Sequence, residues 1–248
     1  NVGAGSPRVR VGGQMPARLR PTAPNASDAI LVGDPGRALM LAQELLEQPK
    51  MSNHARGLWG YTGVTQGGRE LTVQSTGMGG PSAGIVLADL AELGVRRAIR
   101  VGTCTSLGEL EAGKLAIVSG TFPEPGGFVR PAAAFEAPRR PLVVAHPQLT
   151  DRLVHALGEE ARSVVGVSLD VLHRPDLEVH PAAEVADMQT AALFATGREL
   201  DVAVAALLVV TAVRDGVVLP DQELEPAAQR AGGVAAAHAV EERVLLAP

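Results

Sequence analysis

Three arginines near apolar stretches of this chain could together bind an anion. Arg37 follows the turn GDPG, Arg56 lies in an expected loop, and Arg100 lies inside the apolar run AIRVGT. A guanidinium group binds phosphate oxygens in pairs, Gly33 lets the backbone approach a ligand closely, and Thr103 adds a hydroxyl donor. Taken alone, each arginine also fits a structural role, although a buried Arg100 would need a partner. The pattern therefore indicates either a phosphate site or unrelated structural charges.

Alternating strand and helix patterns provide the elements that would position these residues. Strands are expected over residues 29–32, 61–64, 71–75, 98–101, 115–119, 164–168 and 202–213, and helices over 37–46, 83–93, 148–157, 182–196 and 227–246. We expect Ser82 to cap the second helix, 61–64 and 71–75 to form a hairpin, and 123–138 to form a loop. The alternation predicts an α/β fold in which helices flank a mixed, largely parallel central sheet. Such sheets bind ligands beyond the carboxyl ends of their strands.

Length and composition limit the class of protein. We expect one domain over residues 1–248, with residues 1–15, rich in Gly, Pro and Arg, as a flexible N-terminal arm. A net charge of −5 and an aromatic content of 2% argue against a nucleic-acid partner. The longest apolar run, 202–213, is too short to span a bilayer, so we expect no membrane partner. Cys104 is the only cysteine, which rules out a disulfide within the chain and favours the cytoplasm.

Other reactive residue types show no recognised catalytic pattern of their own. His173 and His180 lack metal-ligand spacing and are interpreted as loop residues, so no metal and no organic cofactor is expected. Cys104 has no base near it in the sequence and is interpreted as a packing residue. Asp215 precedes Gly216 and can be a simple turn residue.

Seven short blocks occur in a fixed order from residue 16 to the end of the chain: VGDPGRA, ARGLWGYTG, STGMGGPSA, RVGTCTSLG, SLDVL, ADMQTAALF and VVTAVRDG. Together they resemble the first family of nucleoside phosphorylases, which includes hexameric bacterial-type purine nucleoside phosphorylases and uridine phosphorylases. The resemblance implies a three-layer α/β sandwich and a pentosyltransferase activity. Inorganic phosphate, as co-substrate, would attack the anomeric carbon of a nucleoside and release the free base and a (deoxy)ribose 1-phosphate. It also implies a homo-oligomer built from dimers, with a hexamer expected.

The same resemblance implies roles for individual residues. The phosphate site would consist of Gly33, Arg37, Arg100 and Thr103, completed by Arg56 from a neighbouring subunit; Met188 and Gln189 would border the ribose; Cys104, Thr105, Leu172 and Asp215 would surround the base. Arg100 and Asp215 would be catalytic. Arg100 would hold the phosphate opposite a transition state that resembles an oxocarbenium ion. Asp215 would donate a proton to the leaving base, which favours a purine or purine-like nucleoside.

The sequence departs from the family pattern at Gln189, where the family has a glutamate. An amide has one accepting atom where a carboxylate has two, so ribose binding is expected to weaken by about 1.5–3 kcal/mol. Three alternatives therefore stay open beside phosphorolysis. They are a hydrolytic nucleosidase, a degenerate homologue that binds nucleosides without turnover, and a biosynthetic relative acting on an unusual sugar or base. The three arginines argue against the hydrolase, which needs no phosphate site.

Overall fold

The computed structural model of the protein describes residues 18–124, 141–170, 179–214 and 216–239. The expected N-terminal arm and most of the expected loop 123–138 lie outside these residues. The strands are β1 (Asp28–Val32), β2 (Leu46–Asn53), β3 (Gly60–Thr65), β4 (Glu70–Ser75), β5 (Arg97–Ser106), β6 (Leu115–Glu124), β7 (Val143–Val144), β8 (Ala161–Leu169), β9 (Val185–Asp187) and β10 (Ala203–Val213). The helices are α1 (Pro35–Leu45), α2 (Gly79–Glu92), α3 (Pro147–Leu157), α4 (Thr190–Leu200) and α5 (Asp221–Ala239), with short 3-10 turns at Ala55–Gly57 and Gly158–Glu160.

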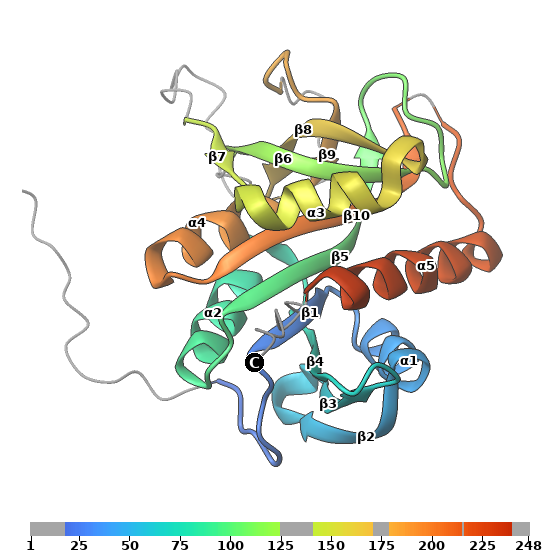
Figure 1. Cartoon of the computed structure of the whole chain (residues 1–248). Coiled ribbons are helices and arrows are strands. Elements are labelled where there is room, and N and C mark those ends of the chain that lie inside the picture. The colour runs from blue at the N-terminus through green and yellow to red at the C-terminus, as the bar shows by residue number, and fades with distance from the viewer. Residues whose placement is uncertain (1–17, 125–140, 171–178, 215, 240–248) are drawn as a thin grey trace, which may run out of the picture.

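All of these strands belong to one mixed sheet, and its parallel strands run through the centre of the molecule (Figure 1). Strand β1 pairs in parallel with β4 and β5, and β5 pairs in parallel with β10. The expected hairpin is present as the antiparallel pair β3–β4, and β2 continues it. Strand β5 also pairs with β9, which pairs with β8, so β5, β9, β8, β6 and β10 form a closed circuit of pairings. The carboxyl end of β1 lies beside the middle of β5, and that of β4 lies on the other side of β1.

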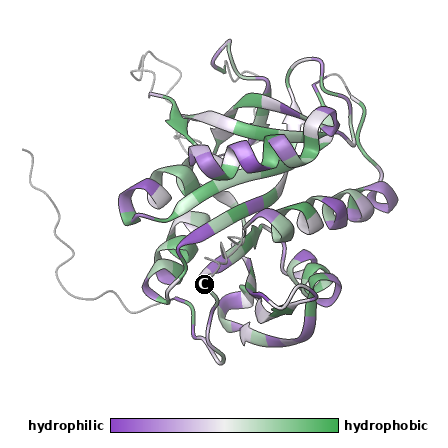
Figure 2. Ribbon diagram, viewed as in Figure 1, coloured by the Kyte–Doolittle hydropathy of each residue, from purple (hydrophilic) through white to green (hydrophobic). Residues whose placement is uncertain are grey.

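Helices cover both faces of the sheet because the central strands are apolar on both sides. In β1, Ile30 and Val32 pack into one core together with residues of α1, α3 and α5, whereas Ala29 and Leu31 pack into a second core with α2 and α4. Figure 2 shows hydrophobic and hydrophilic residues alternating along α3, one side of which packs on the sheet. The arrangement confirms the expected α/β class with helices on both sides of a central sheet. No helix among the described residues is long and apolar enough to cross a membrane.

The turn GDPG starts helix α1 and so places the residues on either side of it. The side chain of Asp34 accepts a hydrogen bond from the backbone N–H of Arg37 at 2.8 Å, and Pro35 occupies the first helical position. Because β1 is wholly buried before this turn, Gly33 is held at the edge of the sheet and Arg37 on the first turn of the helix. The turn is therefore a helix cap, and its flanking residues remain free to serve a ligand.

The expected cap of the second helix is wrong. Helix α2 begins at Gly79 and not at residue 83, and no side chain caps its start at Met78. Ser82 lies inside the helix, where its hydroxyl donates to the backbone carbonyl of Thr76 at 2.6 Å. Positive φ angles at Gly77 and Gly79 allow the chain to turn sharply between β4 and α2. Helix α2 therefore starts closer to the end of β4 than a cap at Ser82 would place it.

Two helices and one strand also differ clearly from expectation. The predicted helix 182–196 is a short strand, β9, followed by α4 from Thr190, because residues 185–187 pair with β5 and β8. Helix α5 begins at Asp221, six residues before the expected start, with Pro226 inside it. The polar strand β2 was not expected at all, since LEQPKMSN has no alternating apolar pattern; it forms because β3 offers a free edge.

Gly197 on α4 provides a test of how closely this helix packs on β10. A Cβ atom at this position would lie 2.5 Å from Val204 Cγ2 and 2.7 Å from the backbone oxygen of Val202. We therefore expect Gly197→Ala to lower the free energy of unfolding by about 1–3 kcal/mol in urea titrations. The control is Gly233→Ala on α5, where a Cβ meets nothing within 4 Å, so alanine should stabilise by about 0.5–1 kcal/mol. Equal effects of the two changes would contradict the packing.

Candidate active site

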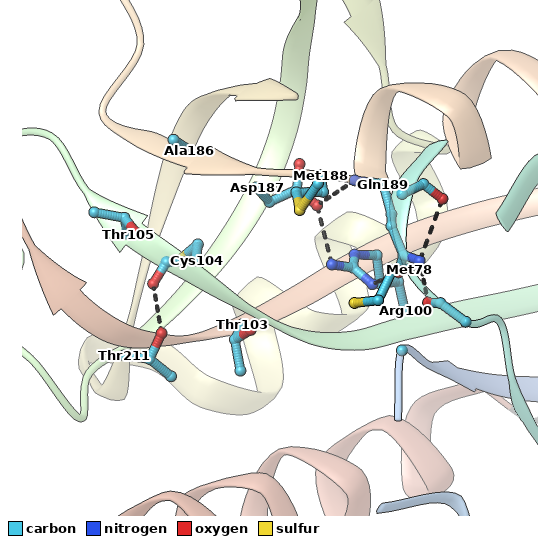
Figure 3. Close-up of a pocket in the computed structure, with 13 residues that line it drawn as sticks. Met78, Arg100, Thr103, Cys104, Thr105, Ala186, Asp187, Met188, Gln189 and Thr211 are labelled. Carbon is cyan, nitrogen blue, oxygen red and sulfur yellow. Dashed lines mark hydrogen bonds and ion pairs between the residues drawn. The ribbon is translucent and has the colours of Figure 1, made fainter. Parts of the chain in front are cut away.

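A pocket lies where the carboxyl ends of β1 and β4 approach β5, β9 and the start of α4 (Figure 3). It is lined by Gly33, Gly77, Met78, Gly79, Arg100, Thr103, Cys104, Thr105, Ala186, Asp187, Met188, Gln189 and Thr211. Met78, 88% exposed, lies at its outer edge. This is the edge of the sheet at which the parallel strands predict a ligand.

Most of the residues expected in the site line this one pocket. They are Gly33, Arg100, Thr103, Cys104, Thr105, Met188 and Gln189. Leu172 and Asp215 lie outside the described residues, as does His173. Arg56 is exposed, with a positive φ of 60°, in the 3-10 turn after β2 and does not line the pocket. The tertiary structure thus gathers residues from positions 33 to 189 of the sequence around one cavity, but neither Arg37 nor Arg56 lines it.

Arg100 forms a buried ion pair with an acid that the sequence did not single out. Its Nη2 lies 3.0 Å from Oδ2 of Asp187, and the two side chains are only 5% and 3% exposed. Its Nε donates to the hydroxyl of Thr190 at 3.2 Å, and its Nη1 donates to Oε1 of Gln189. Three of the five guanidinium N–H groups are therefore used, and two are left for a ligand.

Asp187 is held in place from several directions. Its Oδ1 accepts from the hydroxyl of Ser168, the residue opposite it in the parallel pair β8–β9. Its Oδ2 accepts from the backbone N–H groups of Gln189 and Thr190 at 3.0 and 2.9 Å and from the hydroxyl of Thr190 at 2.6 Å. The carboxylate thus ties the first residues of α4 to β9 and orients Arg100. The only signal for Asp187 in the sequence was that a buried Arg100 would need an acidic partner.

Gln189 connects Arg100 to the turn between β4 and α2. Its side-chain NH₂ donates to the carbonyl of Gly77 at 2.7 Å and to that of Gly79 at 3.4 Å. Its Oε1 accepts from Arg100 and lies 3.2 Å from the hydroxyl of Thr76, whose single hydrogen has a nearer acceptor in the carbonyl of Val32 at 3.0 Å. The residue is only 3% exposed, so these contacts lie in the wall of the pocket.

Arg37 lies close enough to Arg100 for the two positive charges to interact. Partial burial lowers the pKa of Arg37; Arg100 lowers it further, while Asp34 and Glu225 oppose the shift. The Arg37 guanidinium makes no hydrogen bond or ion pair with the residues that the structure describes. Positive charge therefore comes from Arg100 in the pocket and from Arg37 within electrostatic range of it, balanced in part by Asp187 at Arg100 and by Asp34 and Glu225 at Arg37.

Two hydroxyl groups on β5 face the pocket without partners. Thr103 and Thr105 line it, and neither hydroxyl makes a hydrogen bond within the described part of the chain. The hydroxyl of Thr211 on β10 is used, because it donates to the carbonyl of Cys104 at 3.3 Å. Thr103 and Thr105 are therefore the polar side chains of the pocket with the most capacity for a ligand.

Cys104 is buried, which determines its reactivity. Burial raises the pKa of the thiol, and Asp187 raises it further against the opposing charge of Arg100, to about 12. At pH 8 the thiolate fraction is then about 10⁻⁴, so we expect negligible reaction of the folded protein with a maleimide or a disulfide reagent. In guanidinium chloride one thiol should react, which a colorimetric thiol assay measures. Rapid labelling of the folded protein would contradict this and would reopen a nucleophilic role.

The histidines and acids of the described residues do not form a metal site. No group of three or more histidine, cysteine, aspartate or glutamate side chains within the described ranges could hold a metal ion. His180 instead stacks on Phe122, with ring centroids 3.7 Å apart.

Solved structures with this fold include nucleoside phosphorylases. The fold matches a structure from a study of two uridine phosphorylases of the oomycete Phytophthora capsici, with a TM-score of 0.79 and 21% identity over 92% of this chain and 94% of that chain. It also matches a purine nucleoside phosphorylase from Toxoplasma gondii in complex with immucillin-H, with a TM-score of 0.69 and 23% identity over 86% of this chain and 92% of that chain. At these identities the likeness establishes the fold.

The sequence itself establishes the family. The model of the phosphorylase superfamily matches residues 27–242, and this chain therefore belongs to that superfamily, which confirms the resemblance of the seven blocks. DeoD-type purine nucleoside phosphorylases of Oceanobacillus iheyensis and Clostridium novyi are 46% and 48% identical to it over 83 residues. These segments cover 33% of this chain and 35% of each relative, so the match spans about a third of the relatives' length.

Proposed function

We propose that this protein catalyses phosphorolysis of a purine or purine-like nucleoside. The observation that carries the proposal is Arg100, which lines the pocket with N–H donors unused and lies within electrostatic range of a second guanidinium, Arg37. Such a pair suits a phosphate ion. Superfamily membership and the partial identity to purine nucleoside phosphorylases support the same reaction.

In the proposed reaction the phosphate is both nucleophile and counter-charge. Arg37 and Arg100, with the backbone at Gly33 and the hydroxyl of Thr103, hold it below the anomeric carbon. A phosphate oxygen forms a bond to that carbon as the bond to the base nitrogen breaks, and the base leaves with the electron pair. The held dianion stabilises the positive charge that develops on the sugar. Inorganic phosphate is the co-substrate, and no cofactor is required.

The remaining proposed roles concern the residues that bind the sugar and the base. Met188 and Gln189 border the sugar, and Cys104 and Thr105, with Leu172, border the base. Asp215 protonates the departing base, which limits the charge that develops on a purine ring. Thr105 offers a free hydroxyl to the base, since it has no partner within the described chain.

Assembly and location complete the proposal. Arg56 is exposed and does not line the pocket of its own chain. This placement supports the proposal that Arg56 completes the phosphate site of a neighbouring subunit. The functional unit is then a dimer, and a hexamer of three dimers is the expected assembly. The cytoplasm is the proposed compartment, since the single cysteine forms no disulfide within the chain.

A panel of nucleosides incubated with and without phosphate tests the function. Release of a purine only in the presence of phosphate is the expected result, with the sugar 1-phosphate as second product. Release that does not depend on phosphate would instead identify a hydrolase. A rise in melting temperature with nucleosides, without release of base, would identify a protein that binds nucleosides without turnover.

A further inference from the structure

Gly102 is a buried glycine in the middle of β5, two residues after Arg100. It does not line the pocket, and its φ lies outside the left-handed region in which glycine is favoured. A glycine inside a strand weakens that strand, and it often marks a place where another group approaches the backbone closely. The backbone of β5 therefore gives no reason for a glycine here, and the reason must lie in what contacts it.

The guanidinium of Arg100 occupies the space that a side chain at position 102 would need. Residues 100 and 102 point to the same face of β5, and a Cβ atom at Gly102 would lie 2.6 Å from Cζ of Arg100, 2.7 Å from Nη2 and 2.9 Å from Nη1. These three distances are nearly equal, so the Cβ would lie over the flat face of the guanidinium and not beside its edge. Carbon atoms in favourable contact are about 3.5–4.0 Å apart, so an alanine would require the guanidinium to move by about 1 Å.

The guanidinium cannot make this movement and keep its present partners. Its Nη2 lies 3.0 Å from Oδ2 of Asp187 (Figure 3), and its Nε donates to the hydroxyl of Thr190 at 3.2 Å. Asp187 is itself held by two backbone N–H groups at the start of α4 and by the hydroxyl of Ser168, so it is not free to follow. The side chains of the ion pair are only 5% and 3% exposed, so bulk water would not replace a weakened contact.

We infer that Gly102 is a positioning residue: the absence of its side chain creates the flat surface on which the Arg100 guanidinium rests, in the orientation that a bound phosphate requires. The inference rests on the proposed function, in which Arg100 holds the phosphate. Gly102 acts only through Arg100, since it does not line the pocket itself. A displacement of about 1 Å in a group that positions a reactant can cost about 10²-fold in rate.

Replacing Gly102 by alanine should therefore impair the binding of phosphate. With inosine, or another purine nucleoside that the wild type cleaves, held at saturating concentration, we expect Gly102→Ala to raise the KM for phosphate by about tenfold or more. The matched control is Gly120→Ala on β6, because a Cβ there would also lie close to a neighbouring side chain, 3.0 Å from Cδ2 of Leu142, but away from the pocket. It should lower the melting temperature without changing the KM for phosphate.

A cycle of variants shows whether Gly102 acts through the guanidinium or through another contact. Arg100→Met/Asp187→Asn removes both charges of the ion pair, and the methionine side chain ends one atom short of the position of Cζ. In the wild-type background, Gly102→Ala should lower the melting temperature by about 4–8 °C. In the Arg100→Met/Asp187→Asn background it should not lower it, because no guanidinium lies over position 102. Equal losses in the two backgrounds would show that the alanine meets another group and would overturn the inference.

The outcomes separate this inference from the proposed function. If the wild type cleaves a nucleoside and Gly102→Ala has an unchanged KM for phosphate, the inference is overturned while phosphorolysis stands. If the wild type cleaves no nucleoside, the proposed function fails, and calorimetric titration with inorganic phosphate then compares wild type with Gly102→Ala. Weaker binding by the variant than by the wild type supports the positioning role, and equal binding, or no binding by the wild type, overturns it.

Discussion

Replacing Arg100 by methionine is expected to lower kcat/KM for phosphorolysis by about 10³-fold or more, because in the proposed reaction this guanidinium holds the charge of the attacking phosphate. The side chain is 5% exposed and lies between Asp187, Gln189 and Thr190, so water does not replace it. Initial rates of base release at several phosphate concentrations measure the effect. The KM for phosphate should rise out of the accessible range.

The same substitution leaves the carboxylate of Asp187 buried without its counter-ion, which by itself destabilises the fold. The double variant Arg100→Met/Asp187→Asn removes both charges and should recover part of the lost stability while remaining inactive. The control is Arg162→Met, because Arg162 is half-exposed and pairs with Glu184 at 2.9 Å away from the pocket. A folded double variant with near wild-type phosphate affinity would show that Arg100 does not bind the phosphate.

Replacing Asp187 by asparagine is expected to lower the free energy of unfolding by about 3–5 kcal/mol, because Arg100 then remains buried without a negative partner. The loss includes the charge-assisted hydrogen bonds that Asp187 accepts from Ser168, Thr190 and two backbone N–H groups. Urea unfolding followed by circular dichroism measures it. Phosphorolysis by the fraction that remains folded should also fall, since the guanidinium loses its orientation.

The control for this change is Asp28→Asn, which removes a different buried carboxylate. Asp28 pairs with Arg97 through two oxygens, but the side chain of Arg97 is 24% exposed and is therefore partly hydrated. The loss there should be smaller, about 1–3 kcal/mol. If Asp187→Asn destabilised the protein no more than Asp28→Asn does, the ion pair with Arg100 would not be the interaction that holds this part of the pocket together.

The elements were predictable where hydrophobic periodicity is strong. Strands β1 and β10 are continuous apolar segments, and the residues QGGR between β3 and β4 mark a hairpin turn, so local sequence alone identified them. Strand β2 was missed because its residues are mostly polar and form a strand only through pairing with β3. The short strand β9 was predicted as part of a helix, because three residues are too few to show the alternating hydrophobic pattern of a strand. Only its pairing with β5 and β8 makes it a strand.

The candidate site was predictable to a similar degree. Motif order placed Gly33, Arg100, Thr103 and Gln189 in one site, and the structure gathers them around one pocket. It did not identify Asp187, although this acid lies in the block that contains Gln189. An aspartate in a short segment looks like a helix-capping or turn residue, and its importance appears only when a buried arginine from another strand lies 3.0 Å away.

The sequence by itself determined the superfamily, the α/β class and the presence of arginines suited to a phosphate, because these depend on residue type and on patterns along the chain. The tertiary structure alone decided which groups surround Arg100 and how much of their hydrogen-bonding capacity is already used. Gln189 illustrates the difference: in the sequence it is a substitution expected to weaken sugar binding, and in the structure its amide contacts Arg100, Thr76, Gly77 and Gly79. The physical reason is that hydrogen bonds depend on distance and direction in space, and these partners are between 89 and 113 residues away along the chain.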